Sequence, residues 1–235
     1  MNKLLKIVLA VAILLFFCSI LYFFNLVAYC HSLESTCEGR LYQLGKCLNH
    51  YHDFNNSYPN YDDHGNMLWS WRVVLADAVA LGKSAERLNL DEHWNTEHNL
   101  QIIDIARMDE SFSCPFLYPE NKHAVYVALT GEGTAWTEIN EGRKTPQEMN
   151  DMILILETPN PTNHWAEPGD DVTVDDVIKF YETYKNRKRT FFSPKKHFPN
   201  RFFTAGGYCG TYDDIEHVDE LKHRLSISRE IIDIR

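Results

Sequence analysis

The chain has 235 residues, of which 44% are hydrophobic, 24% charged and 13% aromatic. This composition excludes disordered, collagen-like and low-complexity proteins. The formal net charge is −10, and an acidic surface disfavours nucleic acid, which binds basic patches.

The N-terminal region is apolar from Ile7 to Val27, a stretch of 21 residues. As a helix it would extend roughly 30 Å, the thickness of a bilayer core. Lys3 and Lys6 precede this stretch, and no Lys or Arg follows it until Arg40. The asymmetry predicts that the N-terminus lies in the cytoplasm and that the chain beyond the stretch lies outside it.

We therefore predict two parts, a cytoplasmic tip with a transmembrane anchor at 1–30 and an extracytoplasmic domain at 31–235. A cleaved signal peptide is the alternative, but its apolar region would span only about 7–15 residues and end in small residues. The segment before Cys30 is bulky, since Tyr29 directly precedes it, which is a poor cleavage site for a signal peptidase or for lipoprotein processing. The expected domain carries 21 Lys and Arg against 33 Asp and Glu, a net charge of −12.

An amphipathic stripe follows the apolar stretch with no intervening Pro. Its apolar residues are spaced by 4, 4, 3, 4 and 3 positions, namely Leu33, Cys37, Leu41, Leu44, Leu48 and Tyr51. This spacing is typical of one face of a helix. We expect one long helix whose first half lies in lipid, whose second half packs on a domain, and which ends near Asn55 and Asn56.

Further elements follow in chain order. We predict a helix capped by Ser70 that runs through Leu88 with a weak point at Gly82, and a helix capped by Thr96 that reaches Ala106. The runs 125–129 and 152–156 predict strands.

The C-terminal part carries local signals for three more elements. Thr173 to Asp176 has the spacing of a capping box, which predicts a helix. Gly206 and Gly207 lie between two strand-like runs and predict a two-residue hairpin turn. A short helix is expected from Val218 to Leu225. Strands and helices without regular alternation indicate an α+β fold.

Several segments in this order resemble one family, the planctomycete-type pilin-like proteins catalogued as domain of unknown function 1559. The segments are Cys37-Glu38-Gly39-Arg40-Leu41-Tyr42-Gln43-Leu44-Gly45, Leu48 to Asp53, Ser70-Trp71-Arg72-Val73, Leu90 to Asn95, His98-Asn99, Cys114-Pro115, Gly131 to Ala135, Ile153 to Glu157 and Trp165-Ala166-Glu167-Pro168.

The resemblance implies a pilin or pseudopilin architecture, with a long N-terminal helix laid on an antiparallel sheet with additional short helices, and a domain outside the inner membrane. It implies a structural or protein-interaction role, linked to a secretion-type assembly, and no catalytic activity or cofactor. Cys37 and Cys114 both fall in matching segments, which favours a disulfide between them. Closing so long a loop would stabilise the fold by about 4 kcal/mol.

The chain departs from the family pattern in two places. Typical prepilins have a basic, glycine-ended leader followed by Phe-Thr-Leu-Ile-Glu, whereas positions 1–30 contain neither Gly nor Glu. The family signature of a His, a spacer and Asp-Gly is replaced by His197 followed by Gly206-Gly207. A standalone anchored binding module is therefore expected ahead of a filament subunit.

Metal-ligating residue types gather in two places. His50, His52 and Asp53, with Asp62, Asp63 or His64, would suit a catalytic metal, and an anchored metal-dependent hydrolase is the alternative function. However, His50 and His52 point about 200° apart on one helix, which favours ordinary polar residues at a helix end.

The second group is Asp91, Glu92 and Asn95, whose oxygens would suit calcium, although a solvated acidic loop is the commoner outcome. Trp69, Trp71 and Trp94 are expected as core or rim aromatics. Gly131 and Gly133 are expected to end a strand rather than to open a helix. We expect no bound cofactor, no metal and no nucleic acid, and the membrane and envelope proteins as partners.

Overall fold

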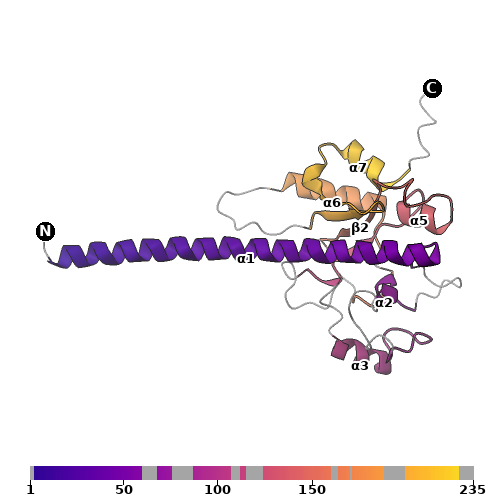
Figure 1. The fold of residues 1–235 in the computed structure, drawn as a ribbon, viewed down its shortest axis with the longest axis horizontal. Coiled ribbons are helices and arrows are strands. Elements are labelled where there is room, and N and C mark those ends of the chain that lie inside the picture. The colour runs from indigo at the N-terminus through magenta and orange to yellow at the C-terminus, as the bar shows by residue number, and fades with distance from the viewer. Residues whose placement is uncertain are drawn as a thin grey trace.

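The computed structural model describes residues 3–59, 68–75, 87–106, 112–114, 124–159, 164–169, 171–187 and 199–227. It is an α+β protein in which a long helix crosses one face of an antiparallel sheet (Figure 1). In chain order the elements are α1 (Lys3–Asn55), α2 (Trp71–Leu75), α3 (Glu97–Ala106), β1 (Tyr126–Ala128), α5 (Ala135–Asn140), β2 (Ile153–Glu157), α6 (Val174–Asn186), β3 (Arg201–Thr204), β4 (Cys209–Thr211), the 3-10 turn η3 (Tyr212–Asp214) and α7 (Val218–Leu225).

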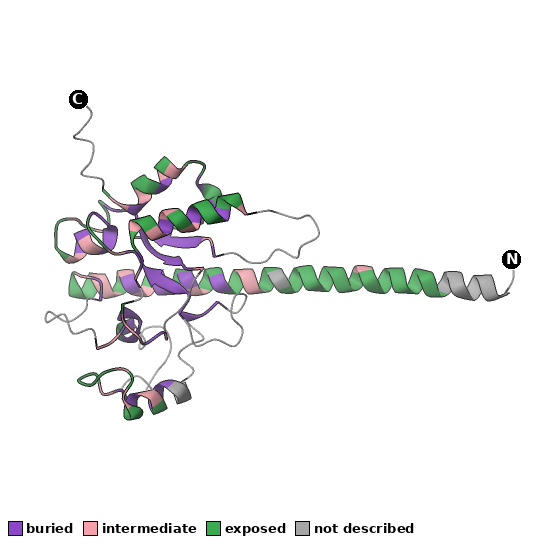
Figure 2. Ribbon diagram, turned by 180° about the vertical axis from the view of Figure 1, so that it is seen from behind, coloured by how far each residue is buried: buried purple, intermediate pink, exposed green. Residues whose placement is uncertain are grey.

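Helix α1 is continuous over 53 residues, about 80 Å at 1.5 Å per residue. Its first half stands clear of the domain and its second half is embedded in it (Figure 2). The predicted stripe is the buried face, since Cys37, Leu41, Leu44 and Leu48 have no exposed surface. The helix ends where predicted because Asn56 turns to the left-handed conformation at φ 56°, which asparagine tolerates well.

The sheet has four strands in the order β1-β2-β3-β4, all antiparallel to their neighbours. Alternate side chains point to opposite faces, and both faces are buried. Tyr126, Ala128 and Phe203 belong to the apolar cluster that α1 joins. Val127 and Phe202 belong to a second cluster on the other face, with residues of α6 and α7. The sheet therefore lies between α1 and the pair α6 and α7 (Figure 1).

Helix α6 begins at the predicted capping box. The Thr173 hydroxyl accepts a hydrogen bond from the Asp176 backbone N–H at 3.3 Å, and the Asp176 carboxylate accepts one from the Thr173 N–H at 3.2 Å. Two N–H groups that the helix leaves without partners are satisfied in this way. The structure also confirms α3 up to Ala106 and α7 from Val218 to Leu225.

Three local predictions need correction. Thr204 pairs with Tyr208 and the turn closes with the Gly207 N–H donating to the Thr204 carbonyl, so the hairpin has a three-residue loop with Gly207 at φ 94°. A three-residue loop that ends in a left-handed residue is a common hairpin connection. The second helix is described over Trp71–Leu75, residues 76–86 lie outside the described residues, and Leu88 is not helical.

The third correction concerns the segment after Gly133, where a short helix was not expected. Helix α5 forms there because Ala135, Trp136 and Ile139 bury one side of it in the core. Glu138 also accepts a hydrogen bond from the Gly133 N–H at 3.2 Å. Six residues are too few to signal a helix by periodicity, and such a helix depends on tertiary contacts.

Gly45 sets how closely α1 approaches the sheet. A Cβ atom there would lie 2.2 Å from the Phe203 ring, whereas one on Gly39 meets nothing within 4 Å. We expect Gly45→Ala to lower the free energy of unfolding by about 1–3 kcal/mol through overpacking. Gly39→Ala is the matched control on the same helix and should raise it by up to about 1 kcal/mol, because alanine favours helix. Denaturant unfolding of the detergent-solubilised chain measures both, and equal effects at the two positions would contradict the packing.

Candidate functional site

The exposed half of α1 is the largest apolar surface of the described chain. Its bulky side chains between Leu14 and Phe24 are mostly 57% to 72% exposed. Among the described residues, α1 is the one helix long and apolar enough to cross a membrane. Exposure of so large an apolar surface to water is unfavourable, and contiguous patches of this kind mark membrane or protein contacts.

The polar side chains in this half are satisfied within the helix itself. The Ser19 hydroxyl donates to the Phe16 carbonyl at 2.7 Å, and the Asn25 amide donates to the Leu21 carbonyl at 2.8 Å. In a hydrocarbon environment an unpaired polar group costs several kcal/mol. These internal hydrogen bonds therefore make the interruptions of the apolar run compatible with lipid.

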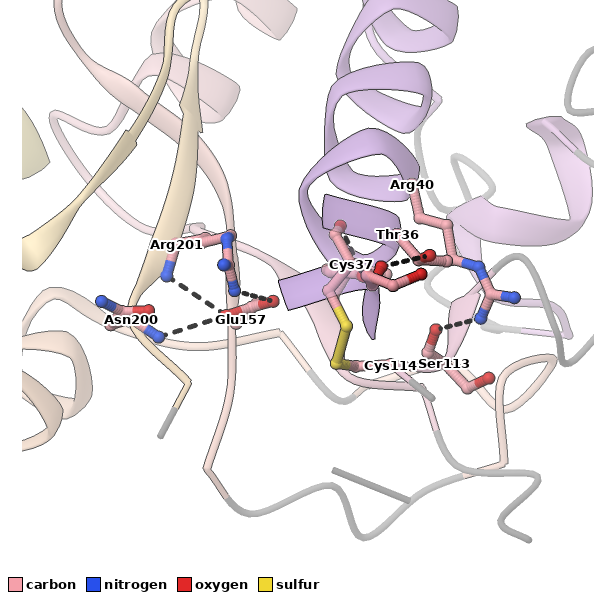
Figure 3. The surroundings of a disulfide bond; sticks show 10 residues. Thr36, Cys37, Arg40, Ser113, Cys114, Glu157, Asn200 and Arg201 are labelled. Atoms are coloured by element: carbon pink, nitrogen blue, oxygen red, sulfur yellow. Dashed lines mark hydrogen bonds and ion pairs between the residues drawn. A yellow bond between two sulfur atoms is a disulfide. The ribbon is translucent and has the colours of Figure 1, made fainter. Parts of the chain in front are cut away.

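The exposed half meets the domain at Cys37, the first fully buried residue of α1 among those whose burial the structure describes. Cys37 forms a disulfide with Cys114 (Figure 3), the pair that the family resemblance favours. Arg40 donates a hydrogen bond to the Ser113 carbonyl at 2.8 Å, and Tyr126 donates one to the Cys37 carbonyl at 2.9 Å. These contacts fix the helix to β1 and to the 112–114 segment at the point where it enters the domain.

A buried carboxylate lies beside this disulfide. Glu157 is 1% exposed, and its Oε2 accepts hydrogen bonds from the backbone N–H groups of Asn200 and Arg201 at 3.2 and 3.3 Å. The Arg201 guanidinium lies 3.7 Å from its other oxygen. Removing one partner of such a buried pair is strongly destabilising, so the pair fixes the join between β2 and β3 (Figure 3).

Ligand atoms that could hold a metal ion converge at one place in the described part of the chain. They belong to Cys37, Cys114 and Glu157 and lie within 4.8 Å of one another. The two sulfurs are bonded to each other, and a metal ligand must be a thiolate. With the disulfide formed, this cluster is a structural junction.

The outer edge of β1 is covered by the Arg72 side chain and by the short segment Asp171–Val172, which we call the strap. Arg72 is fully buried and donates two hydrogen bonds to the Tyr126 carbonyl at 2.5 and 3.0 Å. Further along the edge, the Val172 N–H donates to the Ala128 carbonyl at 3.0 Å. The neighbouring Asp171 carboxylate accepts a hydrogen bond from the Ala128 backbone, and its burial raises its pKa to about 7. An edge closed in this way does not pair with other strands.

The residues expected for a catalytic metal do not come together among the described residues. His50 lies on the exposed side of α1 with its ring 4.8 Å from that of Phe54. The His52 ring packs 5.5 Å from the Tyr58 ring, and its Nδ1 lies 4.0 Å from the Asp53 carboxylate. The further candidates Asp62, Asp63 and His64 lie outside the described residues, as does His197 of the C-terminal signature.

The expected calcium ligands form the rim of an ordered loop. Asn99 is buried and holds the loop through hydrogen bonds to the Asn89 and His93 carbonyls, both at 3.1 Å. Asp91 and Glu92 are exposed, and the Asn95 side-chain oxygen bonds to His93 at 2.8 Å. The oxygen expected from Asn95 is therefore already engaged, which favours the solvated acidic loop.

The next residues are the tryptophans and the cysteines outside the disulfide, whose burial indicates their roles. Trp71 is a core residue at 3% exposure, while Trp69 and Trp94 are partly buried at its rim. Cys47 and Cys209 are thiols outside the disulfide. Burial raises the pKa of Cys209 to about 12, which makes it a poor nucleophile because the thiolate is the reactive form.

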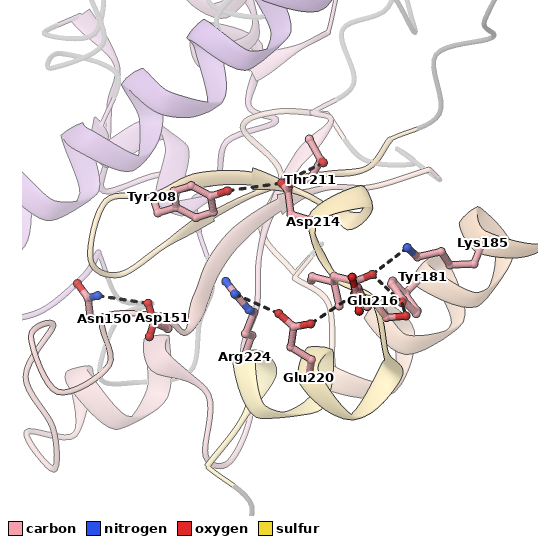
Figure 4. A network of polar contacts seen from close by, with 11 residues as sticks. Asn150, Asp151, Tyr181, Lys185, Tyr208, Thr211, Asp214, Glu216, Glu220 and Arg224 are labelled. Atoms are coloured by element: carbon pink, nitrogen blue, oxygen red, sulfur yellow. Dashed lines mark hydrogen bonds and ion pairs between the residues drawn. The ribbon is translucent and has the colours of Figure 1, made fainter.

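One polar surface could not be predicted from sequence, because its residues come from segments far apart in the chain. A depression of about 630 Å³ is lined by Asp151, His217, Asp219, Glu220, His223 and Arg224. The carboxylates have local partners there, since Arg224 donates to Glu220 at 3.2 Å and Asn150 donates to Asp151 at 3.3 Å (Figure 4). Lys222 contacts Asp219 at 3.3 Å. These pairs are local, within α7 or between neighbouring residues, and leave the depression a mixed-charge surface.

Because the disulfide closes a loop of 77 residues, we expect its removal to lower the free energy of unfolding by about 4 kcal/mol. The test is Cys37→Ala combined with Cys114→Ala, compared with Cys209→Ala, which removes a thiol and no bond. Because both sulfurs are buried, a dithiol reductant should open the bond in the unfolded chain and leave it closed in the folded one. Rapid reduction under native conditions would contradict the burial.

Asp171 gives the domain a defined pH dependence. Its pKa is raised in the folded state, so its contribution to stability is full below the unfolded pKa of about 4 and is lost as the pH rises through about 7. We expect Asp171→Asn to stabilise the protein at pH 8 by about 2 kcal/mol. It should also remove the fall in the free energy of unfolding that Asp171 causes as the pH rises. Asp175→Asn at an exposed position is the control, and thermal unfolding across pH 4–8 is the measurement. If stability changed with pH equally in the wild type and in Asp171→Asn, the burial of this carboxylate would be refuted.

Comparison with known proteins gives no neighbour on which to base a function. No family model matches the chain, and neither a curated protein nor a solved structure is similar to it.

Proposed function

We propose that the protein is a single-pass envelope protein that holds its acidic domain at the outer face of the cytoplasmic membrane. The observation that carries this proposal is α1 itself, a continuous helix with an exposed apolar half and a half buried in the domain. Lys3 and Lys6 on the N-terminal side of the apolar stretch support a cytoplasmic N-terminus.

The role that this arrangement suits is structural or protein-binding. The helix passes from lipid into the core without a break, and the disulfide and the Arg40 contact hold it at the entry point. The domain would therefore be carried at a fixed height above the bilayer rather than on a flexible tether. Its net charge of −12 over 31–235 suits basic or polar protein partners in the envelope.

The finer assignment is to a pilin-like or pseudopilin-like protein. It is supported by the ordered set of family-like segments and by the long helix that packs on an antiparallel sheet. A filament subunit of that kind pairs a membrane-buried carboxylate with a neighbouring subunit. Positions 1–30 contain no acidic residue, so we favour a standalone anchored module over a subunit of a secretion-type assembly.

The orientation can be tested through its two lysines. In the wild type, a C-terminal alkaline phosphatase fusion should be active, and the protein should resist alkaline carbonate extraction. Lys3→Glu with Lys6→Glu removes the cytoplasmic positive charge and should lower phosphatase activity by severalfold, because the orientation signal is lost. Lys179→Glu with Lys222→Glu, two exposed changes in the domain, is the charge-matched control and should leave the activity unchanged.

Two results would overturn the proposal. One is recovery of the full-length protein in the soluble fraction. The other is an intact mass that begins inside the apolar stretch, which would show removal of Lys3 and Lys6. Crosslinking in native membranes followed by identification of the neighbours then separates a standalone module, joined to few partners, from a subunit joined to copies of itself.

A further inference from the structure

The junction where α1 enters the domain contains the residue types of a metal site as well as a disulfide. One ligand atom from each of Cys37, Cys114 and Glu157 lies within 4.8 Å of the other two. The three residues are buried, with exposures of 0%, 0% and 1%. They come from α1, from the 112–114 segment and from the end of β2. The cluster therefore joins three parts of the chain that are far apart in sequence.

The same two cysteines offer different chemistry before and after oxidation. A chain is synthesised with thiols, and a disulfide forms from them later by exchange with an oxidant. Until then the cluster contains two thiols and one carboxylate. Thiolates are preferred ligands of Zn²⁺, and a carboxylate oxygen is a common further ligand. The set is suited to zinc in the reduced chain and forms a covalent junction in the oxidised chain.

A zinc ion can be placed between these atoms with small movements. Zn–S bonds of about 2.3 Å in a tetrahedral site put two sulfurs about 3.8 Å apart, and a Zn–O bond is about 2.1 Å long. The carboxylate oxygen already lies within 4.8 Å of both sulfurs. The sulfurs have to separate, which rotation of the two cysteine side chains about their Cα–Cβ bonds achieves. The fourth position of the ion is then left for a water molecule.

The Glu157 carboxylate is oriented as a metal ligand requires. Its Oε2 accepts hydrogen bonds from the backbone N–H groups of Asn200 and Arg201, and carboxylates that bind metals are typically held by such outer hydrogen bonds. Figure 3 shows the carboxylate between these two residues on one side and the disulfide on the other. A carboxylate has lone pairs for about four contacts, so the hydrogen bonds and a metal bond can exist together.

The charges of the junction favour a divalent ion. Two thiolates and the Glu157 carboxylate carry three negative charges, of which Zn²⁺ offsets two. The Arg201 guanidinium, 3.7 Å from the carboxylate, offsets the third. A buried charge is costly unless it is compensated. The zinc-bound junction is neutral overall, whereas a monovalent ion would leave one negative charge uncompensated.

We propose that Cys37, Cys114 and Glu157 bind Zn²⁺ in the folded chain before the disulfide forms. Binding makes two Zn–S bonds and one Zn–O bond, and the two thiols release two protons. A disulfide-bearing oxidant then takes two electrons from the thiolates and two protons from water, becomes a dithiol, and leaves the Cys37–Cys114 bond and a free zinc ion. The ion thus closes, at an earlier stage, the same loop of 77 residues that the disulfide closes.

The test uses the full chain in detergent, reduced by a phosphine in denaturant and refolded without oxygen. Titration with zinc against a chromophoric chelator should show one more bound ion per chain in the reduced form than in the oxidised form. Cobalt(II) in place of zinc should give the intense sulfur-to-metal absorption of a thiolate complex, in the reduced form alone. Equal numbers of bound ions in the two forms would overturn the proposal.

Zinc should also stabilise the reduced fold. At about a hundredfold excess of zinc over its Kd, we expect the unfolding temperature of the reduced chain to rise by about 5 °C or more and that of the oxidised chain to stay unchanged. If the reduced chain does not fold without metal, zinc should restore its fold, because binding and folding are then coupled. A reduced chain whose folding and unfolding temperature do not respond to zinc would overturn the proposal.

Matched variants assign the extra ion to this cluster. Cys37→Ala with Cys114→Ala should lose it, whereas Cys47→Ala with Cys209→Ala, which removes two thiols outside the disulfide, should retain it. Glu157→Gln should weaken zinc binding by about tenfold or more, because one anionic ligand is lost. Retention of the ion in the first variant, or its loss in the second, would overturn the assignment.

Discussion

The packing of α1 on the sheet is the contact on which the remaining structure depends. Gly45 lets the helix backbone lie against Phe203, and the fully buried Leu41, Leu44 and Leu48 extend the same face into the larger apolar cluster. Because α1 contributes to this core along half its length, the domain does not have a complete interior without it. The buried half of α1 and the sheet are therefore one folding unit.

The sheet is correspondingly well covered. Its second face is buried by α6 and α7, and the β1 edge is closed by the Arg72 guanidinium and by the Asp171–Val172 strap. An exposed edge strand is a common route to unwanted association, and this one is occupied by groups from two distant parts of the chain. The buried Glu157 and Arg201 pair ties β2 to β3 beside the disulfide. The buried polar groups named here thus hold neighbouring elements together.

Much of this architecture could be predicted because its signals are local. The stripe from Leu33 to Tyr51 gave the buried face of α1, the Thr173 capping box gave the start of α6, and the apolar runs at 125–129 and 152–156 gave β1 and β2 to within two residues. The three-residue hairpin loop was missed because the pair Gly206 and Gly207 suggests a tighter turn. Helix α5 was missed because tertiary burial, rather than periodicity, stabilises it.

The site was less predictable, because its contacts join residues far apart in sequence. Arg72 donates to the Tyr126 carbonyl, and Glu157 forms an ion pair with Arg201. No rule of sequence spacing predicts such pairs. His50 and His52 lie in different environments, as their positions about 200° apart on one helix indicated. The pairing of Cys37 with Cys114 was available from the family resemblance and not from the spacing of the cysteines.

The continuity of α1 has a mechanical consequence. A helix without a proline, fixed to its domain at Cys37, is stiff against twisting, so a rotation of its exposed half about the helix axis would rotate the domain with it. In the proposed membrane arrangement, a neighbour that contacts one side of the exposed half would therefore set which side of the domain faces outward. Contacts made by the exposed half of α1 and contacts made by the domain would in this way be coupled through one continuous helix.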